Sequence, residues 1–440
     1  MSFRRLRAFA APAVILTLVV GALIASPASG GPTPAPVRLG FQQGDDWEPA
    51  IATDRFGHVY VLYNHYGADP ACPDCASPHM ELQVSSDNGV TWSSPRPLWP
   101  ASTRQDDPQI VVDPVDGRTV YAAFMQGDKA SMYVAKSTDF GATWKAVLVE
   151  PLQRGTDKEI LAVRGKDLYL AYNAAQKIFA SISHDSGATW TTKLIFDGSE
   201  HFGWALPSGG AVAPNGHVYF GWTGFSQNGQ FRGPVDVFVS RSADGGNTWK
   251  ASLLDVSEAP PRCSACGWAY WGPSNALAVD GKNRVYALWN ANDSKFGPNR
   301  MLFSRSNDNG STWAAPADVS RAAKGVNNLF PAIVARGDGD VRIAWMDDRN
   351  GRDDGTDGPD ARWNVYYRTS RNAGSTWSSE LQVSRFVSGY PYKLASPKDG
   401  FLEPYGDYFE MDIDAGGRTH ATWGEGPSYA GPGNTWYANF

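Results

Sequence analysis

The feature that most constrains the fold is an eight-residue pattern, S-x-D-x-G-x-T-W, which occurs six times in 440 residues. The copies begin at Ser85, Ser137, Ser183, Ser242, Ser306 and Ser370, and Asn372 replaces the aspartate in the last copy. Successive aspartate positions, with Asn372 as the last, lie 52, 46, 59, 64 and 64 residues apart. One supersecondary unit therefore recurs with loops of different length, and a repeat fold overrides the domain count that chain length alone would suggest.

Each copy has the composition of a rigid turn. Asp and Asn side chains accept hydrogen bonds from the backbone that follows them, Gly supplies a positive φ, and Ser and Thr hydroxyls close the turn. The Trp that ends each copy is predicted to begin the next strand and to be a buried anchor.

A second repeat lies upstream of each octapeptide. It consists of two short β-rich runs joined by a Gly or Asp turn, as in residues 48–54 and 59–63. Seven such hairpins occur, and the later ones begin near residues 107, 159, 210, 275, 331 and 409. A third run precedes each octapeptide and a fourth follows it. Four strands per unit make a propeller blade, so we predict an all-β propeller of seven four-stranded blades, with six blades as the alternative.

The seventh hairpin has no octapeptide after it. Residues 435–438 read as its third strand, and residues 37–41 are the natural source of its fourth. Closure of the ring by an N-terminal strand would remove the exposed sheet edges. The predicted propeller domain spans residues 37–440.

The octapeptide resembles the Asp box, or BNR repeat, of sialidase-like (neuraminidase superfamily) β-propellers, and the resemblance covers nearly all of the predicted mature chain. It implies that the boxes are structural turns remote from the active site. A true sialidase also carries an early Phe/Tyr-Arg-Ile-Pro motif, an arginine triad, an Asp acid/base and a Tyr–Glu nucleophile pair. The stretch Val37-Arg38-Leu39-Gly40 is not that motif. The resemblance therefore implies a glycan-directed, sialidase-like hydrolase, with sialic acid cleavage disfavoured.

The order of strands sorts the loops between two faces. The boxes share one face with the short hairpin turns, whereas long loops and the connections between blades share the other, where function is expected. Asp107, Glu159 and Asp407 are the candidate acids and bases at the mouth of the channel. The candidate ligand-binding residues there are Trp47, Arg104, Asp106, Trp204, Tyr270, Trp271, Tyr405 and Tyr408, whose aromatic rings could stack on sugars. The alternative is that each polar residue caps its own strand.

Arginines are scarce at the predicted mouth. Arg104 is placed there, while Arg232, Arg300 and Arg349 lie in longer loops on the same face. A triad for a substrate carboxylate cannot be assigned from these positions. A non-catalytic propeller that binds carbohydrate or a surface protein therefore remains the alternative function.

An acidic loop follows the second strand of the sixth hairpin. Asp347, Asp348, Asp353, Asp354 and Asp357 could supply the oxygen ligands that Ca²⁺ prefers, although the spacing is not that of an EF-hand. The alternative is a solvated loop. We expect no required cofactor, with Ca²⁺ as the possible ion.

Four cysteines form two C-x-x-C pairs, Cys72 with Cys75 and Cys263 with Cys266. In an exported protein they predict two local disulfides, and a Cys₄ zinc site is the alternative if the two loops meet. His79 and His201 could each be ligands, but lone loop histidines usually are not.

The N-terminal residues have the pattern of a secretory signal. A basic segment with Arg4, Arg5 and Arg7 precedes an apolar run, so residues 1–28 are predicted to be a signal peptide and residues 29–36 a Pro/Gly-rich linker. The formal net charge of −6 argues against nucleic acid or an anionic membrane as partner. We expect a secreted monomer without a membrane span, whose partner is an extracellular glycan or glycoconjugate.

Overall fold

A computed structural model of the protein describes residues 35–41, 44–99, 102–151, 156–226, 233–261, 271–349, 362–385, 387–388, 408–425 and 433–440. The predicted signal peptide and most of the predicted linker lie outside these ranges. The described residues from Ala35 onward belong to one unit, which spans Pro34–Phe440.

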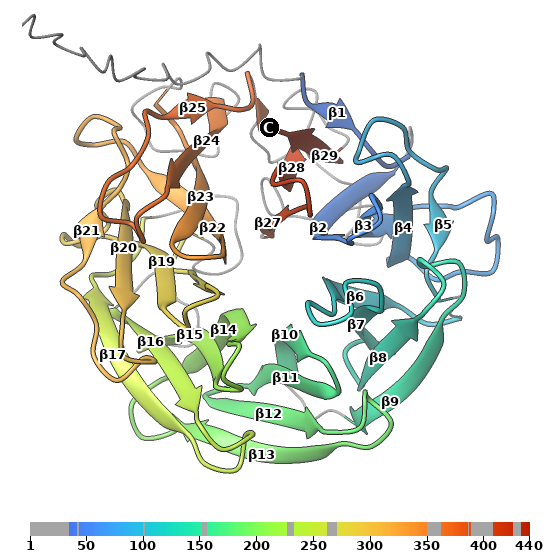
Figure 1. Ribbon diagram of the computed structural model, residues 1–440, viewed down its shortest axis with the longest axis horizontal. Coiled ribbons are helices and arrows are strands. Elements are labelled where there is room, and N and C mark those ends of the chain that lie inside the picture. Colours follow the sequence, from blue (N-terminus) through green and yellow to red (C-terminus); the bar gives the residue numbers. More distant parts are fainter. Residues whose placement is uncertain are drawn as a thin grey trace, which may run out of the picture. The chain divides into compact units, whose positions relative to one another are not determined.

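The described residues of this unit form seven antiparallel sheets arranged in a ring around a central channel (Figure 1). This arrangement confirms the predicted seven-bladed propeller and excludes the six-bladed alternative. No helix in the described part of the chain has the length and apolar character needed to cross a lipid bilayer.

The first four blades follow one another along the chain. Blade one contains β2 (Asp45–Thr53), β3 (Val59–Tyr66), β4 (His79–Ser85) and β5 (Arg96–Pro97). Blade two contains β6 (Gln105–Val112), β7 (Val120–Gln126), β8 (Ser131–Ser137) and β9 (Lys145–Pro151). Blade three contains β10 (Thr156–Arg164), β11 (Asp167–Ala174), β12 (Lys177–Ser183) and β13 (Thr191–Asp197). Blade four contains β14 (Trp204–Val212), β15 (Val218–Phe225), β16 (Val235–Ser242) and β17 (Lys250–Ser257).

The last three blades complete the ring. Blade five contains β18 (Asn275–Val279), β19 (Val285–Ala291), β20 (Arg300–Ser306) and β21 (Ala317–Asp318). Blade six contains β22 (Asn328–Arg336), β23 (Asp340–Asp347), β24 (Arg362–Ser370) and β25 (Leu381–Gln382), and β26 (Val387–Ser388) also pairs with β24. Blade seven contains β27 (Phe409–Ile413), β28 (Thr419–Glu425) and β29 (Asn434–Asn439).

The fourth strand of blade seven comes from the start of the described chain. β1 (Val37–Arg38) pairs with β29, opposite Tyr437 and Trp436. The backbone N–H of Leu39 extends the pairing by donating to the carbonyl of Thr435 at 2.8 Å. The predicted closure by an N-terminal strand is therefore confirmed (Figure 1).

Blades pack face to face, which explains the composition of their strands. The second strand of a blade lies between two neighbouring sheets, so every residue of β3 and β28 is buried. In β3 this gives a largely apolar run because both faces are covered, whereas β28 also buries polar side chains such as Thr419, His420 and Thr422. The outermost strands β13 and β17 instead alternate exposed and half-buried positions.

The boxes form the rigid turns that their composition predicts. In the first copy, Asp87 Oδ1 accepts from Ser85 Oγ and from the N–H of Thr91, both at 2.8 Å, and Oδ2 accepts from the Thr91 hydroxyl at 2.6 Å. Gly89 has φ +83°, and a Cβ there would lie 1.7 Å from the Tyr437 hydroxyl, so only glycine fits.

The sixth box keeps this geometry with an amide. Asn372 Oδ1 accepts from Ser370 Oγ and from the N–H of Thr376, each at 2.9 Å. Its Nδ2 donates to the Thr376 hydroxyl at 2.9 Å, where an aspartate would accept. The hydroxyl can reverse its role, which explains why this substitution is tolerated.

The tryptophans of the boxes are less buried than the sequence predicts. All six are half-buried rather than buried. Their indole N–H closes the turn in three copies, as in Trp144, which donates to the carbonyl of Gly141 at 3.0 Å.

Candidate functional site

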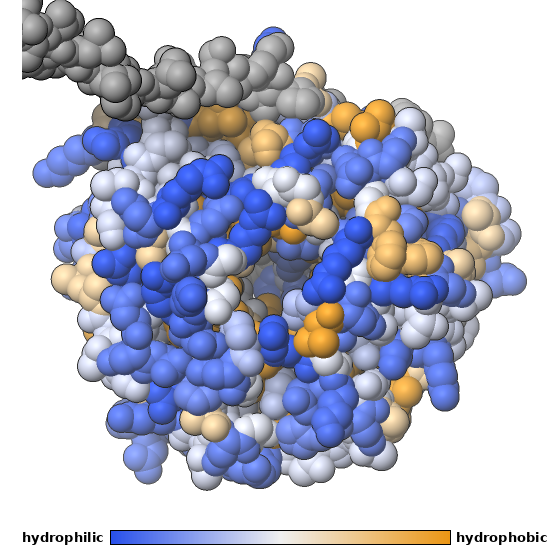
Figure 2. All heavy atoms as spheres, in the orientation of Figure 1, coloured by the Kyte–Doolittle hydropathy of each residue, from blue (hydrophilic) through white to orange (hydrophobic). Residues whose placement is uncertain are grey.

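The axis of the ring is hollow. A cavity of about 580 Å³ is lined by the first strands of all seven blades. A smaller cavity of about 90 Å³ lies toward the face that carries the connections between blades, where Lys158, Phe330 and Tyr408 line it. Gln109 and Glu410 line both cavities, which therefore adjoin. Figure 2 shows one end of the hollow, with mostly hydrophilic side chains around it.

A repeated backbone irregularity positions the residues at the inner end of this face. The pairing of the first two strands slips by one residue in blades one, two, three, four and six. At every slip except that of blade four, one residue has a positive φ: Glu48 (56°), Asp107 (58°), Lys158 (51°) and Phe330 (53°). Such conformations are unfavourable for residues other than glycine, and bulges commonly re-aim side chains beside active sites. The irregularity marks this face as a candidate site.

Asp107 is the centre of a buried polar cluster. Its Oδ1 accepts from the Tyr408 hydroxyl at 3.1 Å, and its Oδ2 lies 3.1 Å from Lys129 Nζ. Lys129 also pairs with Asp157, and Lys158 Nζ lies 3.7 Å from the centroid of the Tyr408 ring. Two carboxylates and two ammonium groups from blades two and three thus meet one tyrosine of blade seven.

Two carboxyl groups in this cluster have opposite preferences for a proton. Burial alone would raise the pKa of Asp107, but the charges of Lys129 and Lys158 outweigh it and lower the pKa below its ordinary value. Glu159 is fully buried, and burial together with the charge of Asp107 raises its pKa well above the ordinary value. Neither oxygen of Glu159 has a hydrogen-bond partner among the described residues. At a pH between the two pKa values, Asp107 is therefore ionised while Glu159 is protonated.

The predicted arginines are occupied by carboxylates. Arg104 Nε contacts both oxygens of Asp106, at 2.8 and 2.9 Å. Arg349 forms the same kind of pair with Asp347 and reaches Glu380 at 2.7 Å. Arg300 faces an exposed Asp293 at 3.6 Å, and Arg232 lies outside the described residues. No arginine triad is assembled among the described residues.

Two of the predicted stacking residues are corrected by their burial. Trp47 and Trp271 expose none of their surface, so neither can offer a ring face to a sugar in this conformation. Trp271 packs edge-to-face against Trp363, with ring centroids 5.3 Å apart. Trp204 is half-buried at the start of β14, and the nearly buried Tyr408 lines the small cavity.

The acidic loop is described only at its start. Asp347 is fully buried and accepts from Arg349 Nε at 2.9 Å and from Trp345 Nε1 at 3.1 Å. Asp348 Oδ1 accepts from the N–H of Asn327 at 2.9 Å. Because these carboxylates already have partners, the predicted calcium role of Asp347 and Asp348 is not supported by their contacts.

Several predicted residues cannot be placed. The calcium candidates Asp353, Asp354 and Asp357, the site candidates Asp407, Tyr270 and Tyr405, and the cysteines Cys263 and Cys266 lie outside the described residues. Cys72 and Cys75 form a disulfide in the loop between β3 and β4.

Sequence reasoning missed residues that the tertiary structure adds. Lys129 belongs to the tight turn between β7 and β8, where nothing in the sequence distinguishes it from a solvated lysine. Glu410 faces the channel from β27 and accepts from Gln109 Nε2 at 2.9 Å. The sequence does contain a signal for the bulges, which is an acid–Pro pair that occurs at Glu48-Pro49 and at Asp107-Pro108.

Comparison with solved structures supports this architecture. A protein of unknown function from Dyadobacter fermentans superposes with a TM-score of 0.52 at 13% identity, covering 93% of this chain and 98% of that one. The Hadza microbial sialidase Hz136 gives a TM-score of 0.46 at 14% identity, covering 90% of this chain and 65% of that one. The likeness to the Dyadobacter fermentans protein agrees with the ring of blades. The chain is a seven-bladed β-propeller.

Comparison with sequences finds similarity to proteins named xyloglucanases, and no protein-family model matches the chain. Xyloglucanase Xgh74A of Acetivibrio thermocellus is 24% identical over 317 residues, covering 61% of this chain and 35% of that protein. A xyloglucanase of a Paenibacillus species is 24% identical over 443 residues, covering 79% and 42% respectively. The chain thus spans less than half the length of these relatives.

Proposed function

We propose that this protein is a secreted glycoside hydrolase of sialidase-like fold that acts on a neutral polysaccharide of the β-glucan type. The observation that carries the proposal is the pair formed by Asp107 and Glu159. Their environments push the two pKa values in opposite directions, which is the arrangement that glycoside hydrolysis needs.

Each carboxyl group has a role that follows from its protonation state. Because its pKa is raised, Glu159 keeps its proton to a higher pH than an ordinary glutamate and can protonate the oxygen of the leaving sugar. Asp107 is ionised and can act as the base or nucleophile, with Tyr408 and Lys129 holding its two oxygens. Both carboxyl groups are buried behind the cavity that Lys158 and Tyr408 line, so one of these two side chains must shift when a sugar binds.

A neutral substrate fits the charges better than a sialoside does. Arg104 and Arg349 are each held by a carboxylate, so neither is available for a substrate carboxylate. The two curated relatives described above are named xyloglucanases, and xyloglucan is a neutral polymer. The N-terminal leader pattern agrees with an extracellular substrate.

The deciding experiment measures sugar release from xyloglucan, other β-glucans, aryl β-glycosides and α-sialosides. We expect turnover of a neutral β-glucan, and a loss of at least about 100-fold in kcat for Glu159→Gln and Asp107→Asn. Asp197→Asn is the matched control, because Asp197 is an exposed carboxylate at the end of β13. Thermal unfolding of each variant separates lost chemistry from lost folding.

One observation favours a second function. Asp107 and Glu159 expose almost no surface, as is common for structural ion networks. A propeller that binds glycan without cleaving it would retain polysaccharide in affinity electrophoresis and release no sugar. That result would reject the hydrolase, whereas full activity in both site variants would reject the roles given to Asp107 and Glu159.

A further inference from the structure

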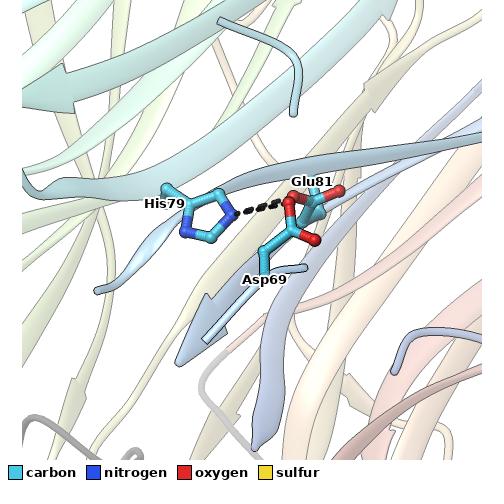
Figure 3. A group of neighbouring side chains, drawn as sticks. All are labelled: Asp69, His79 and Glu81. Carbon is cyan, nitrogen blue, oxygen red and sulfur yellow. Dashed lines mark hydrogen bonds and ion pairs between the residues drawn. The ribbon is translucent and has the colours of Figure 1, made fainter. Parts of the chain in front are cut away.

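A second cluster of titratable side chains lies in blade one. Asp69 belongs to the loop between β3 and β4, and His79 and Glu81 are the first and third residues of β4, which places them on one face of the strand. All three are buried, and one ligand atom from each lies within 4.8 Å of the others. Figure 3 shows the three side chains turned toward one another.

The hydrogen bond on the far side of His79 fixes the state of its ring. Nδ1 lies 2.8 Å from the carbonyl oxygen of Ala76, which can only accept, so Nδ1 carries a proton. In a neutral imidazole the other nitrogen, Nε2, then presents a lone pair. That lone pair faces Glu81 Oε1 at 2.8 Å and Asp69 Oδ2 at 3.9 Å. A proton or a cation must lie between such groups.

The two carboxylates are oriented but not satisfied. Asp69 Oδ1 accepts from the N–H of Ala71 at 2.7 Å, which directs Oδ2 toward His79. Asp69 Oδ2 and Glu81 Oε2 are buried without a hydrogen-bond partner, and no Lys or Arg of the described chain forms an ion pair with either residue. Leaving buried polar atoms unpaired is costly, and a divalent cation would neutralise both carboxylates.

We propose that Asp69, His79 and Glu81 bind one divalent transition-metal ion of the Zn²⁺ type. Ca²⁺ and Mg²⁺ prefer oxygen ligands in larger number, whereas Zn²⁺ accepts imidazole nitrogen together with carboxylate oxygen. Zn²⁺ bonds of about 2.1 Å in a tetrahedron separate the ligand atoms by about 3.4 Å. The observed separations of 2.8 and 3.9 Å lie on either side of that value. Small side-chain shifts would bring these three ligands to that spacing, and a water molecule would supply the fourth.

The ion has a structural role in this arrangement. All three ligands are buried, and a bound ion would fasten the β3–β4 loop to the start of β4. The disulfide between Cys72 and Cys75 constrains the same loop. The orienting contact from Ala76 to the ring of His79 is of the kind that supports metal-binding histidines.

The test uses the whole protein, stripped with EDTA and titrated with Zn²⁺ by calorimetry, with Mg²⁺ and Ca²⁺ as comparison ions. We expect one Zn²⁺ per chain, no saturation by the other two ions at the same concentration, and visible d–d absorption when Co²⁺ replaces Zn²⁺. Asp69→Asn and Glu81→Gln each weaken Zn²⁺ binding by at least about 100-fold. Asp414→Asn is the matched control: it alters a His–Asp pair of blade seven, where His420 Nε2 lies 3.1 Å from Asp414 Oδ2, and should bind as the wild type does.

Wild-type protein without saturable Zn²⁺ binding would overturn the proposal, and so would ligand variants that bind Zn²⁺ as tightly as the wild type. If a variant fails to fold, the wild type still decides. Absence of both the Co²⁺ absorption and a Zn²⁺-dependent rise in Tm then contradicts the site.

Discussion

The hydroxyl of Tyr408 donates to Asp107 Oδ1 at 3.1 Å, which joins the segment entering blade seven to blade two. The two residues are 301 positions apart in the chain, and only closure of the ring brings them together. Because the ammonium group of Lys158 in blade three also lies over the ring of Tyr408, the candidate site is shared by three blades.

Removing this hydroxyl tests whether the bond serves catalysis. Tyr408→Phe should cost about 1–2 kcal/mol in the free energy of unfolding, because a hydrogen bond to a charged group is lost. It should also lower kcat on a neutral β-glucan by about 10-fold, with KM little changed. Tyr172→Phe is the control, since Tyr172 of blade three donates to Glu150 of blade two at 2.9 Å. A similar fall in kcat for both variants would contradict a specific role for Tyr408.

Lys129 pairs with Asp107 and Asp157, so its removal should change both the free energy of unfolding and the pH–activity profile. Lys129→Met leaves Asp107 and Asp157 without this cation and should cost about 2–3 kcal/mol, measured by urea unfolding. The pKa of Asp107 should rise, which moves the acid limb of the pH–activity profile to higher pH. Lys177→Met removes only an exposed pair with Asp197 and should change neither. If the acid limb of the Lys129→Met profile does not move, Lys129 does not affect the pKa of the reacting group.

Glu159 should make stability fall as pH rises. Its folded-state pKa is raised, so its favourable contribution is complete below the ordinary pKa of glutamate, about 4.3, and is lost as pH climbs toward the folded value. Glu159→Gln cannot ionise, and its stability relative to wild type should increase steadily from pH 4 to pH 8. Urea unfolding at several pH values measures this difference. The exposed Glu200→Gln should follow the wild type, and a flat difference for Glu159→Gln would mean that Glu159 is ionised throughout.

The aspartates of the boxes should make the thermal stability of the protein fall in acid. The hydroxyl and N–H of Thr143 and the hydroxyl of Ser137 lower the pKa of Asp139 to about 2. A lowered pKa stabilises the fold above the ordinary value near 3.8, and this contribution is lost as pH falls through about 2. Asp139→Asn should therefore lose less Tm than wild type between pH 5 and pH 2.

The sixth box provides the reverse experiment. Asn372→Asp restores the carboxylate that the other copies carry, so its Tm should fall more steeply with acid than that of the wild type. Differential scanning calorimetry across the same pH range compares both variants. Equal acid sensitivity of Asp139→Asn, Asn372→Asp and wild type would show that the boxes do not titrate during unfolding.

The candidate site was only partly predictable. Asp107 and Glu159 follow from the connections between blades, because strand order alone decides which face each connection reaches. Trp47 and Trp271 follow from the same rule, yet both are buried, because the sequence does not tell on which side of an inner strand a side chain lies. A bulge beside Trp47 changes that alternation by one residue.

The sequence by itself determined the blade, the number of blades and the closure of the ring. These depend on local turn chemistry, on strand periodicity and on one spare strand at residues 37–41, all of which short segments specify. Only the tertiary structure decided which charges meet. Lys129 lowers the pKa of Asp107 and Asp107 raises that of Glu159, because burial strengthens interactions between residues that distant segments bring together.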